Sequence, residues 1–186
     1  MAVLPIIEVP DPRLREKSVP VENFDQNLQT LIDDMFETMY KAPGIGLAAI
    51  QVGVAKRLLV IDLQSPDENE GKDNDKGKDK NKHTPLVFIN PEITPEGDEE
   101  SIYNEGCLSV PDQYADVKRP KVIHAKWLDR NGMPHEERLD GLLATCLQHE
   151  IDHLEGILFI DHLSRLKRGI LMKKLLKERK NREEVY

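Results

Sequence analysis

Two histidines separated by three residues form the clearest chemical pattern in the chain, in the segment His149-Glu150-Ile151-Asp152-His153. If the segment is helical, residues four apart lie on one face, so both imidazoles can bind the same metal ion. Glu150 follows the first histidine and can approach a water molecule beside the ion without binding the ion itself. The pattern therefore predicts a metal centre with an acid/base carboxylate. The competing interpretation is a solvated helix face that holds two unrelated histidines.

A catalytic metal site also needs a third protein ligand and an open position for water. Cys107 is the best remaining candidate because it follows Gly106, where the backbone can approach a ligand closely. The other cysteine, Cys146, is expected to be a small apolar core residue. No export signal is visible after Met1, so we expect reduced thiols and a cytoplasmic location.

The element that positions the histidines is a helix predicted from about Gly141 to Leu154. It should end before Gly156, because a glycine can adopt the left-handed conformation that closes a helix. Residues 142–147 are apolar almost all round, which indicates a buried helix at the centre of the fold. Two unpaired imidazoles would be costly in such a helix. This burial favours the metal site over the solvated face.

Short strands and one further helix surround this element in the prediction. An amphipathic helix runs from about Asn23 to Lys41, with Asn23 or Asp25 as its N-cap. Asn131-Gly132 indicates a hairpin turn, and a glycine-bearing loop is expected at 43–49. Strands are predicted at 57–63, 86–89, near Ile93, at 102–103, 121–127 and 136–139. Many short strands around a buried helix indicate an α+β fold.

Residues 66–83 differ from the rest of the chain. They hold six Asp/Glu, five Lys, one His and two Gly, and none of the large hydrophobic residue types. Such a segment cannot bury enough surface to offset the entropy lost on ordering. Strand-like sequence resumes immediately afterwards. We therefore predict a flexible charged insertion within a single domain that spans residues 1–186.

Charge limits the classes of partner. The formal net charge is −8, which argues against general binding to DNA. Residues 162–186 nevertheless hold nine Lys/Arg and three Glu, so a basic C-terminal helix, from about Ser164 to Glu184, closes an acidic chain. No stretch of 18 apolar residues exists, so no membrane span is expected.

Three segments, in this order, resemble the peptide deformylase family, and Asp11–Arg15 and Phe88–Pro91 extend the resemblance to most of the chain outside 66–83. The segments are Gly44-Ile45-Gly46-Leu47-Ala48-Ala49-Ile50-Gln51, Glu105-Gly106-Cys107-Leu108-Ser109 and Gln148-His149-Glu150-Ile151-Asp152-His153-Leu154. The resemblance implies antiparallel sheets packed around the motif-bearing helix. It also implies hydrolysis of the N-formyl group from the formyl-methionine of newly made proteins.

The same resemblance implies the roles of individual residues. Cys107, His149 and His153 would bind the metal, with water as the fourth ligand, and Glu150 would be the general acid/base. The oxyanion would be stabilised by the side-chain amide of Gln51 and the backbone N–H of Leu108. The substrate-binding residues would be Gly46 and Gly106, which pair with the peptide backbone, together with Glu105 and the methionine-pocket residues Ile45, Tyr103, Leu142, Thr145 and Cys146.

The cofactor and partners are predicted on the same basis. A thiolate with two imidazoles accepts Fe²⁺, Zn²⁺, Ni²⁺ or Co²⁺, so the ligands alone do not select the ion. The resemblance favours Fe²⁺ as the working ion, one per chain. It also implies formyl-methionyl nascent peptides as substrates and a ribosome contact through the basic C-terminal helix. A helix docked on the body with a solvated basic face is the alternative.

Two other functions remain open at this point. The first is a zinc metallopeptidase, whose third ligand would come from Glu155, Asp161 or His162, although none of these has the usual spacing. The second is a structural metal site in a binding domain. Structural sites usually have four protein ligands, and no fourth is evident in the sequence.

Overall fold

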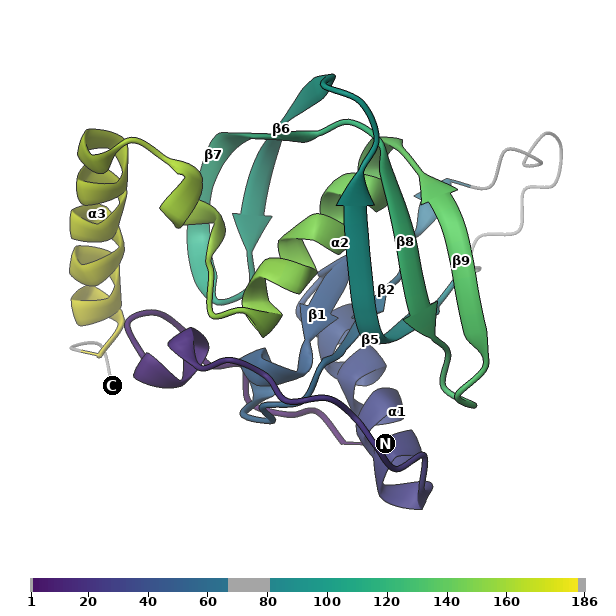
Figure 1. Cartoon of the computed structure of the whole chain (residues 1–186). Coiled ribbons are helices and arrows are strands. Elements are labelled where there is room, and N and C mark those ends of the chain that lie inside the picture. Colours follow the sequence, from purple (N-terminus) through teal and green to yellow (C-terminus); the bar gives the residue numbers. More distant parts are fainter. Residues whose placement is uncertain (1, 67–80, 184–186) are drawn as a thin grey trace, which may run out of the picture.

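The computed structural model describes residues 2–66 and 81–183 of the chain. Most of the predicted insertion, residues 67–80, lies outside the described residues. The described part is α+β, as predicted (Figure 1). Its helices are α1 (Gln26–Lys41), α2 (Gly141–Leu154) and α3 (Arg165–Glu183), with 3-10 turns at Pro12–Arg15, Ala49–Val52 and Phe159–His162. Its strands are β1 (Gly46–Ala48), β2 (Leu58–Ile61), β3 (Ser65–Pro66), β4 (Asn81–Lys82), β5 (Leu86–Pro95), β6 (Glu100–Cys107), β7 (Val110–Pro120), β8 (Ile123–Leu128) and β9 (Pro134–Leu139).

The larger sheet is antiparallel, in the order β1-β2-β5-β8-β9, and helices cover both of its faces. Strand β2 shows how one segment serves both sides, because successive side chains of a strand point to opposite faces. Leu58 and Val60 pack with the apolar face of α1. Leu59 and Ile61 pack with α2. Burial on both faces explains why β2 is apolar at every position.

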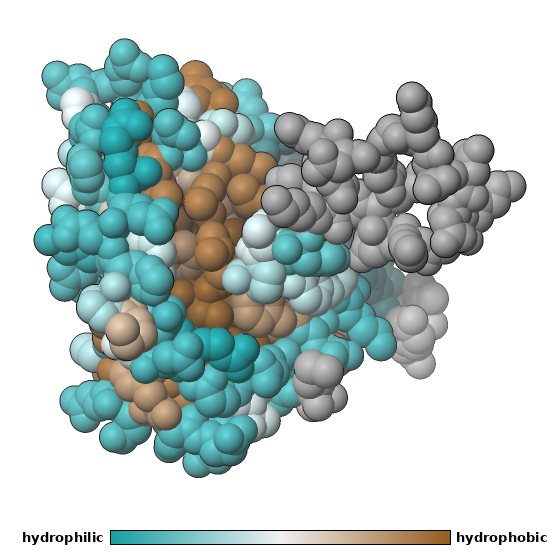
Figure 2. Space-filling view, turned by 90° about the vertical axis from the view of Figure 1, so that its right-hand side faces the viewer, coloured by the Kyte–Doolittle hydropathy of each residue, from teal (hydrophilic) through white to brown (hydrophobic). Residues whose placement is uncertain are grey.

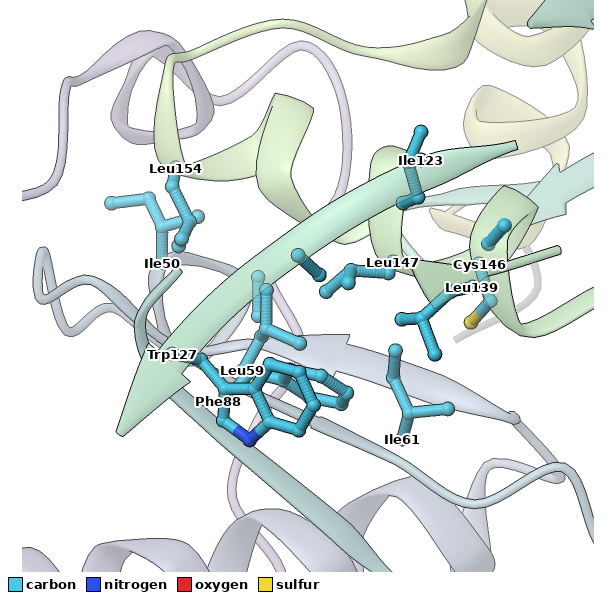
Figure 3. Close-up of a cluster of buried hydrophobic side chains, with 13 residues drawn as sticks. Ile50, Leu59, Ile61, Phe88, Ile123, Trp127, Leu139, Cys146, Leu147 and Leu154 are labelled. Atoms are coloured by element: carbon cyan, nitrogen blue, oxygen red, sulfur yellow. The ribbon is translucent and has the colours of Figure 1, made fainter. Parts of the chain in front are cut away.

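The cluster between this sheet and α2 fixes the motif-bearing helix. Leu147 and Cys146 of α2 lie with Leu59, Phe88 and Trp127 from the sheet (Figure 3). The rings of Phe88 and Trp127 are tilted against each other with centroids 4.8 Å apart. Burying such side chains is worth about 1.5–3 kcal/mol each. The helix is thus held by its apolar residues, and its polar residues are free to face elsewhere.

Strands β6 and β7 form a separate antiparallel hairpin on the other side of α2 (Figure 1). Val110 and Val117 of β7 pack with Phe159 and Ile160 and with Leu171 and Leu175 of α3. The register shifts between Gly106 and Cys107, where the pairing jumps from Tyr114 to Val110. This irregularity ends β6 at Cys107 and leaves Leu108 and Ser109 in the turn.

Several predicted boundaries are confirmed. Helix α2 has the predicted bounds, and Gly156 after it has a φ of 73°. Helix α1 begins at Gln26, and the side chain of Asp25 accepts the N–H of Leu28 as an N-cap. Strands β8 and β9 are joined at Asn131-Gly132, as predicted; there the Asp129 carboxylate accepts the N–H of Asn131 at 2.8 Å.

Three predictions were wrong in detail. Residues 46–48, predicted as loop, form strand β1, because their backbone pairs with β2. Strand β7 was not predicted, because its polar and charged residues show no apolar run. The first turn of α2 was expected to be buried, yet Leu142 is 43% exposed, since this end of the helix opens on a cavity.

The surface is not uniformly polar. One face of the molecule shows a hollowed band of hydrophobic residues between hydrophilic rims (Figure 2). Over the described residues, none of the helices has the length and apolar character required to cross a bilayer.

Candidate active site

The three predicted metal ligands converge in the structure. His149 and His153 lie on one face of α2, and Cys107 comes from the end of β6. Their ligand atoms all lie within 4.8 Å of one another, and Cys107 Sγ is 3.3 Å from His153 Nε2. Among residues 2–66 and 81–183, no other group of three His, Cys, Asp or Glu side chains has this arrangement. The distance between Cys107 and the helix could not be predicted from their separation in the sequence. The turn between β6 and β7 brings Cys107 next to the helix.

Hydrogen bonds behind the ligands fix one of the imidazoles. His149 Nδ1 is 2.9 Å from a carboxylate oxygen of Glu105, which leaves Nε2 directed toward Cys107 and His153. Glu105 also accepts two hydrogen bonds from Arg119, at 2.6 and 3.0 Å. Burial raises the pKa of Glu105, but the hydrogen bonds from His149 and Arg119 outweigh it, so its pKa falls to about 2. Glu105 therefore stays ionised and orients a metal ligand, as outer partners of metal sites commonly do.

His153, the second imidazole, meets another requirement of metal binding, which is a neutral ring. Burial and the neighbouring His149 hold the pKa of His153 well below its usual range, which favours the neutral ring that a metal needs. One thiol and two imidazoles form a three-ligand set of the kind found in catalytic sites, which leave a further position for water. The residues present therefore fit one divalent metal ion.

The downstream ligands of the metallopeptidase alternative are engaged elsewhere. Glu155 accepts a hydrogen bond from Arg57 at 2.5 Å, and Asp161 forms an ion pair with Arg15. His162 lies 2.7 Å from the carboxylate of Asp152, outside the metal group. None of the three joins Cys107 and the two histidines.

Glu150 lies beside the ligands in an environment suited to proton transfer. It is 4% exposed, and burial, with Glu105 adding repulsion, raises its pKa to about 7. Its Oε1 lies so close to β1 that a Cβ built on Gly46 would be only 2.5 Å away. Only glycine leaves room there for the carboxylate. A carboxyl with a pKa near neutrality can both accept and return a proton.

Gln51 and Leu108 lie next to Cys107. The Ala48 N–H donates to Gln51 Oε1 at 2.8 Å, which turns the amide nitrogen of Gln51 toward Ser109 Oγ at 3.1 Å and Cys107 Sγ at 3.6 Å. Gln51 lies in the Ala49–Val52 turn and is 1% exposed. Leu108 follows Cys107 in the hairpin turn.

One cavity of about 530 Å³ is bordered by every predicted site residue except His153. The predicted residues on its walls are Ile45, Gly46, Gln51, Tyr103, Glu105, Gly106, Cys107, Leu108, Leu142, Thr145, Cys146, His149 and Glu150. His153 lies behind them. The sequence did not indicate Asn104 and Tyr114 on the walls, or Arg119 beside Glu105, because their places depend on the β6–β7 register. The glycine at 106 is a sequence feature that reflects this packing, because a Cβ there would lie 2.5 Å from the ring of Tyr114.

A metal site, an acid/base carboxylate and a cavity fit several hydrolases, and comparison with known proteins decides among them. The family model for polypeptide deformylase matches residues 3–169. The chain belongs to the polypeptide deformylase family. The enzyme is accordingly a peptide deformylase, which hydrolyses the N-formyl group from the N-terminal formyl-methionine of new proteins and releases formate.

The similarity to individual deformylases extends along the whole chain. The chain is 76% identical over 186 residues to the peptide deformylase of Zymomonas mobilis, with 100% of both chains covered. It is 66% identical over 183 residues to that of Rhizorhabdus wittichii, covering 98% of this chain and 99% of the other. The crystal structure from Legionella pneumophila matches with a TM-score of 0.83 and 47% identity over 98% of each chain. That from Ehrlichia chaffeensis in complex with actinonin has the same TM-score and 44% identity, over 96% of this chain and 98% of the other.

Proposed function

We propose that Cys107, His149 and His153 hold one divalent ion and that Glu150 and Gln51 perform the deformylation beside it. The observation that supports this assignment is the meeting of three ligand atoms next to a buried carboxylate at the wall of one cavity. When bound, the ion would polarise the formyl oxygen and acidify the attacking water.

Glu150 moves the proton in this proposal. Its carboxylate accepts a proton from the water that adds to the formyl carbon, and it then delivers that proton to the departing amine. The pKa of about 7 suits both transfers, because an acid/base group works best near the operating pH. The products are formate and a free N-terminal methionine.

The negative charge that develops on the formyl oxygen is met by two fixed donors. These are the side-chain amide of Gln51, held by Ala48, and the backbone N–H of Leu108 in the hairpin turn. Donors already in place need no reorganisation during the reaction, and losing one typically costs about 10²–10³ in rate.

The rest of the cavity would bind the substrate. Gly46 and Gly106 lie on strands at its two sides, where an extended peptide can pair with their backbones. The methionine side chain would occupy the part of the cavity formed by Ile45, Tyr103, Leu142, Thr145 and Cys146. In this arrangement Glu105 acts through His149, and it does not touch the substrate.

The proposed working ion is Fe²⁺, bound in the cytoplasm, where nascent chains are made. A thiolate beside Fe²⁺ is open to oxidation along the sulfenic-to-sulfonic series. Enzyme purified in air should therefore lose activity and show oxidised Cys107 by peptide mass spectrometry, while Ni²⁺-loaded enzyme should not. Equal loss with both ions would argue against iron.

Glu150→Gln tests the acid/base assignment. The amide keeps the size of the side chain but cannot carry the proton, so turnover of formyl-Met-Ala should fall by about 10²-fold or more. Bound metal and melting temperature should stay close to those of the parent. Glu155→Gln is the matched control, because it removes the charge of a carboxylate that pairs with Arg57 outside the cavity. Turnover by Glu150→Gln above a tenth of normal would exclude Glu150 as the acid/base.

We also propose that α3 docks the enzyme near newly made chains on the ribosome. Leu171 and Leu175 hold the helix on the body, while Leu166, Ile170, Lys173 and Lys177 are exposed. Basic residues on an accessible face favour binding to ribosomal RNA that weakens with salt. Lys173→Glu with Lys177→Glu should reduce ribosome cosedimentation without changing deformylation of free peptides. Cosedimentation equal to that of the parent would remove this proposal.

A further inference from the structure

A buried carboxylate lies at the end of β2, at the base of the charged insertion. Asp62 is 0% exposed and accepts the Tyr40 hydroxyl at 2.7 Å, while His83 Nδ1 lies at 2.9 Å. It also accepts the backbone N–H groups of Gln64 and Thr84, each at 3.1 Å. Burial raises the pKa of Asp62, but these hydrogen bonds outweigh it and hold the pKa below its usual range. The ionised carboxylate therefore fixes the backbone on both sides of the insertion.

Gln64, fixed in this way, has an unusual backbone. Its φ is 50°, a left-handed conformation that non-glycine residues seldom adopt. In this conformation its side-chain nitrogen donates to the Gly44 carbonyl at 2.9 Å. The N–H of Asp62 donates to the next carbonyl, that of Ile45, at 2.9 Å. The carbonyls of Gly44 and Ile45 are thus held by Gln64 and Asp62, which follow β2 in the chain.

The segment of residues 44–46, held in this way, is packed tightly against the reactive groups. A Cβ on Gly44 would lie 2.8 Å from Leu108 Cδ1, and one on Gly46 would lie 2.5 Å from Glu150 Oε1. All three residues of the segment border the cavity. Any displacement of Gly44 therefore moves its neighbours Ile45 and Gly46, to which the proposed function gives the methionine pocket and the peptide backbone.

We propose that Gln64 is a positioning residue, which acts through the Gly44 carbonyl to hold Ile45 and Gly46 in register with the substrate main chain. The proposal rests on the proposed binding roles of Ile45 and Gly46. A binding contact that is equal in the ground and transition states affects KM and leaves kcat unchanged. Gln64 touches neither the metal ligands nor Glu150, and the pairing of Gly46 with Ile61 holds β1 beside Glu150 without it, so the effect of Gln64 belongs on KM.

Gln64→Gly separates positioning from local stability. Glycine adopts a positive φ without strain, which offsets the greater entropy that it gives the unfolded chain, so the melting temperature should stay close to that of the parent. It also removes the hydrogen bond to Gly44. We expect KM for formyl-Met-Ala-Ser to rise about 3- to 10-fold, as for the loss of one hydrogen bond, with kcat within twofold and metal content unchanged.

Gln29→Ala provides the matched control. Gln29 also donates its side-chain amide to a distant backbone carbonyl, that of Arg130 at 2.7 Å, but it lies on α1 away from the cavity. This variant should leave KM unchanged. A KM for Gln64→Gly within 1.5-fold of the parent would overturn the proposal, as would a fall in kcat at constant KM or a fall in melting temperature with loss of metal. A parent enzyme inactive on formyl peptides would instead refute the proposed function.

Discussion

The five-stranded sheet and the β6–β7 hairpin of this enzyme contribute in opposite ways. The five-stranded sheet is covered by α1 and α2 and contributes apolar side chains to two of the hydrophobic clusters. The β6–β7 hairpin buries less, but it supplies Cys107 and Leu108 to the site, together with Glu105 and Arg119 behind His149. Strand β1 joins the two roles, because Gly46 lies so close to Glu150 that a Cβ there would be 2.5 Å from its Oε1. The difference indicates that stability and chemistry depend on separate sheets, with α2 as the element they share.

The largest effect is expected at Cys107, on the hairpin. Replacing an outer partner of a metal ligand typically costs about 10–100-fold in metal affinity or activity, so loss of the ligand itself in Cys107→Ser should cost at least about 10²-fold. Metal content should fall, and the melting temperature of the metal-free protein should stay close to that of the metal-free parent. Atomic absorption and a formyl-Met-Ala assay measure these quantities.

Cys146→Ser is the control for this substitution. Cys146 is buried in α2 and packs against the large sheet. The change should lower stability through packing and polarity while metal stays bound. Equal losses of activity from both substitutions, with metal retained in both, would mean that Cys107 is not the third ligand.

The same division explains how much the sequence could predict. Strand β2 and the start of β5 were predicted because burial on both faces demands an apolar run. Helix α2 was predicted with its bounds, since its apolar face and Gly156 mark it locally. Strand β7 was missed because its pairing with β6, rather than its composition, makes it a strand. Arg119 was missed with it, since its contact with Glu105 depends on that register.

The metal ligands illustrate the same limit. The two histidines could be found from spacing, because one helix fixes their distance. Cys107 could be proposed as the third ligand from its place after Gly106, but its distance from the histidines could not be predicted, since a turn of a hairpin brings it to the helix. Gln64 left no signal at all, because its conformation is set by Asp62 and its contact by the distant Gly44.

The second prediction concerns the large sheet. Leu59→Ala removes a fully buried side chain from the cluster between β2 and α2. The free energy of unfolding should fall by about 2–5 kcal/mol, measured by urea denaturation. The activity of the fraction that remains folded should change little. Ile102→Ala on β6, where the side chain is 63% exposed, should stay within about 0.5 kcal/mol. Loss of metal from Leu59→Ala at temperatures where it is folded would contradict the assignment of stability to the large sheet and chemistry to the hairpin.

The smallest effect is expected from substituting two glycines, Gly46 on β1 and Gly106 on β6. Comparing them tests whether β1, a strand of the large sheet, contributes to the chemistry. Gly46→Ala places a methyl group against Glu150 Oε1 in a buried setting, so the carboxylate must move. A displacement of about 1 Å can lower the rate about 10²-fold, and we expect kcat/KM to fall about 10- to 100-fold.

Gly106→Ala also makes a close contact, at 2.5 Å, but with the ring of Tyr114, which is 67% exposed and can swing outward. Its loss should be a few-fold. The double change with Tyr114→Ala should recover activity at Gly106, because the ring is then absent, whereas at Gly46 it should change nothing. Recovery at both glycines would mean that β1 acts through the hairpin and that Glu150 is not its point of contact.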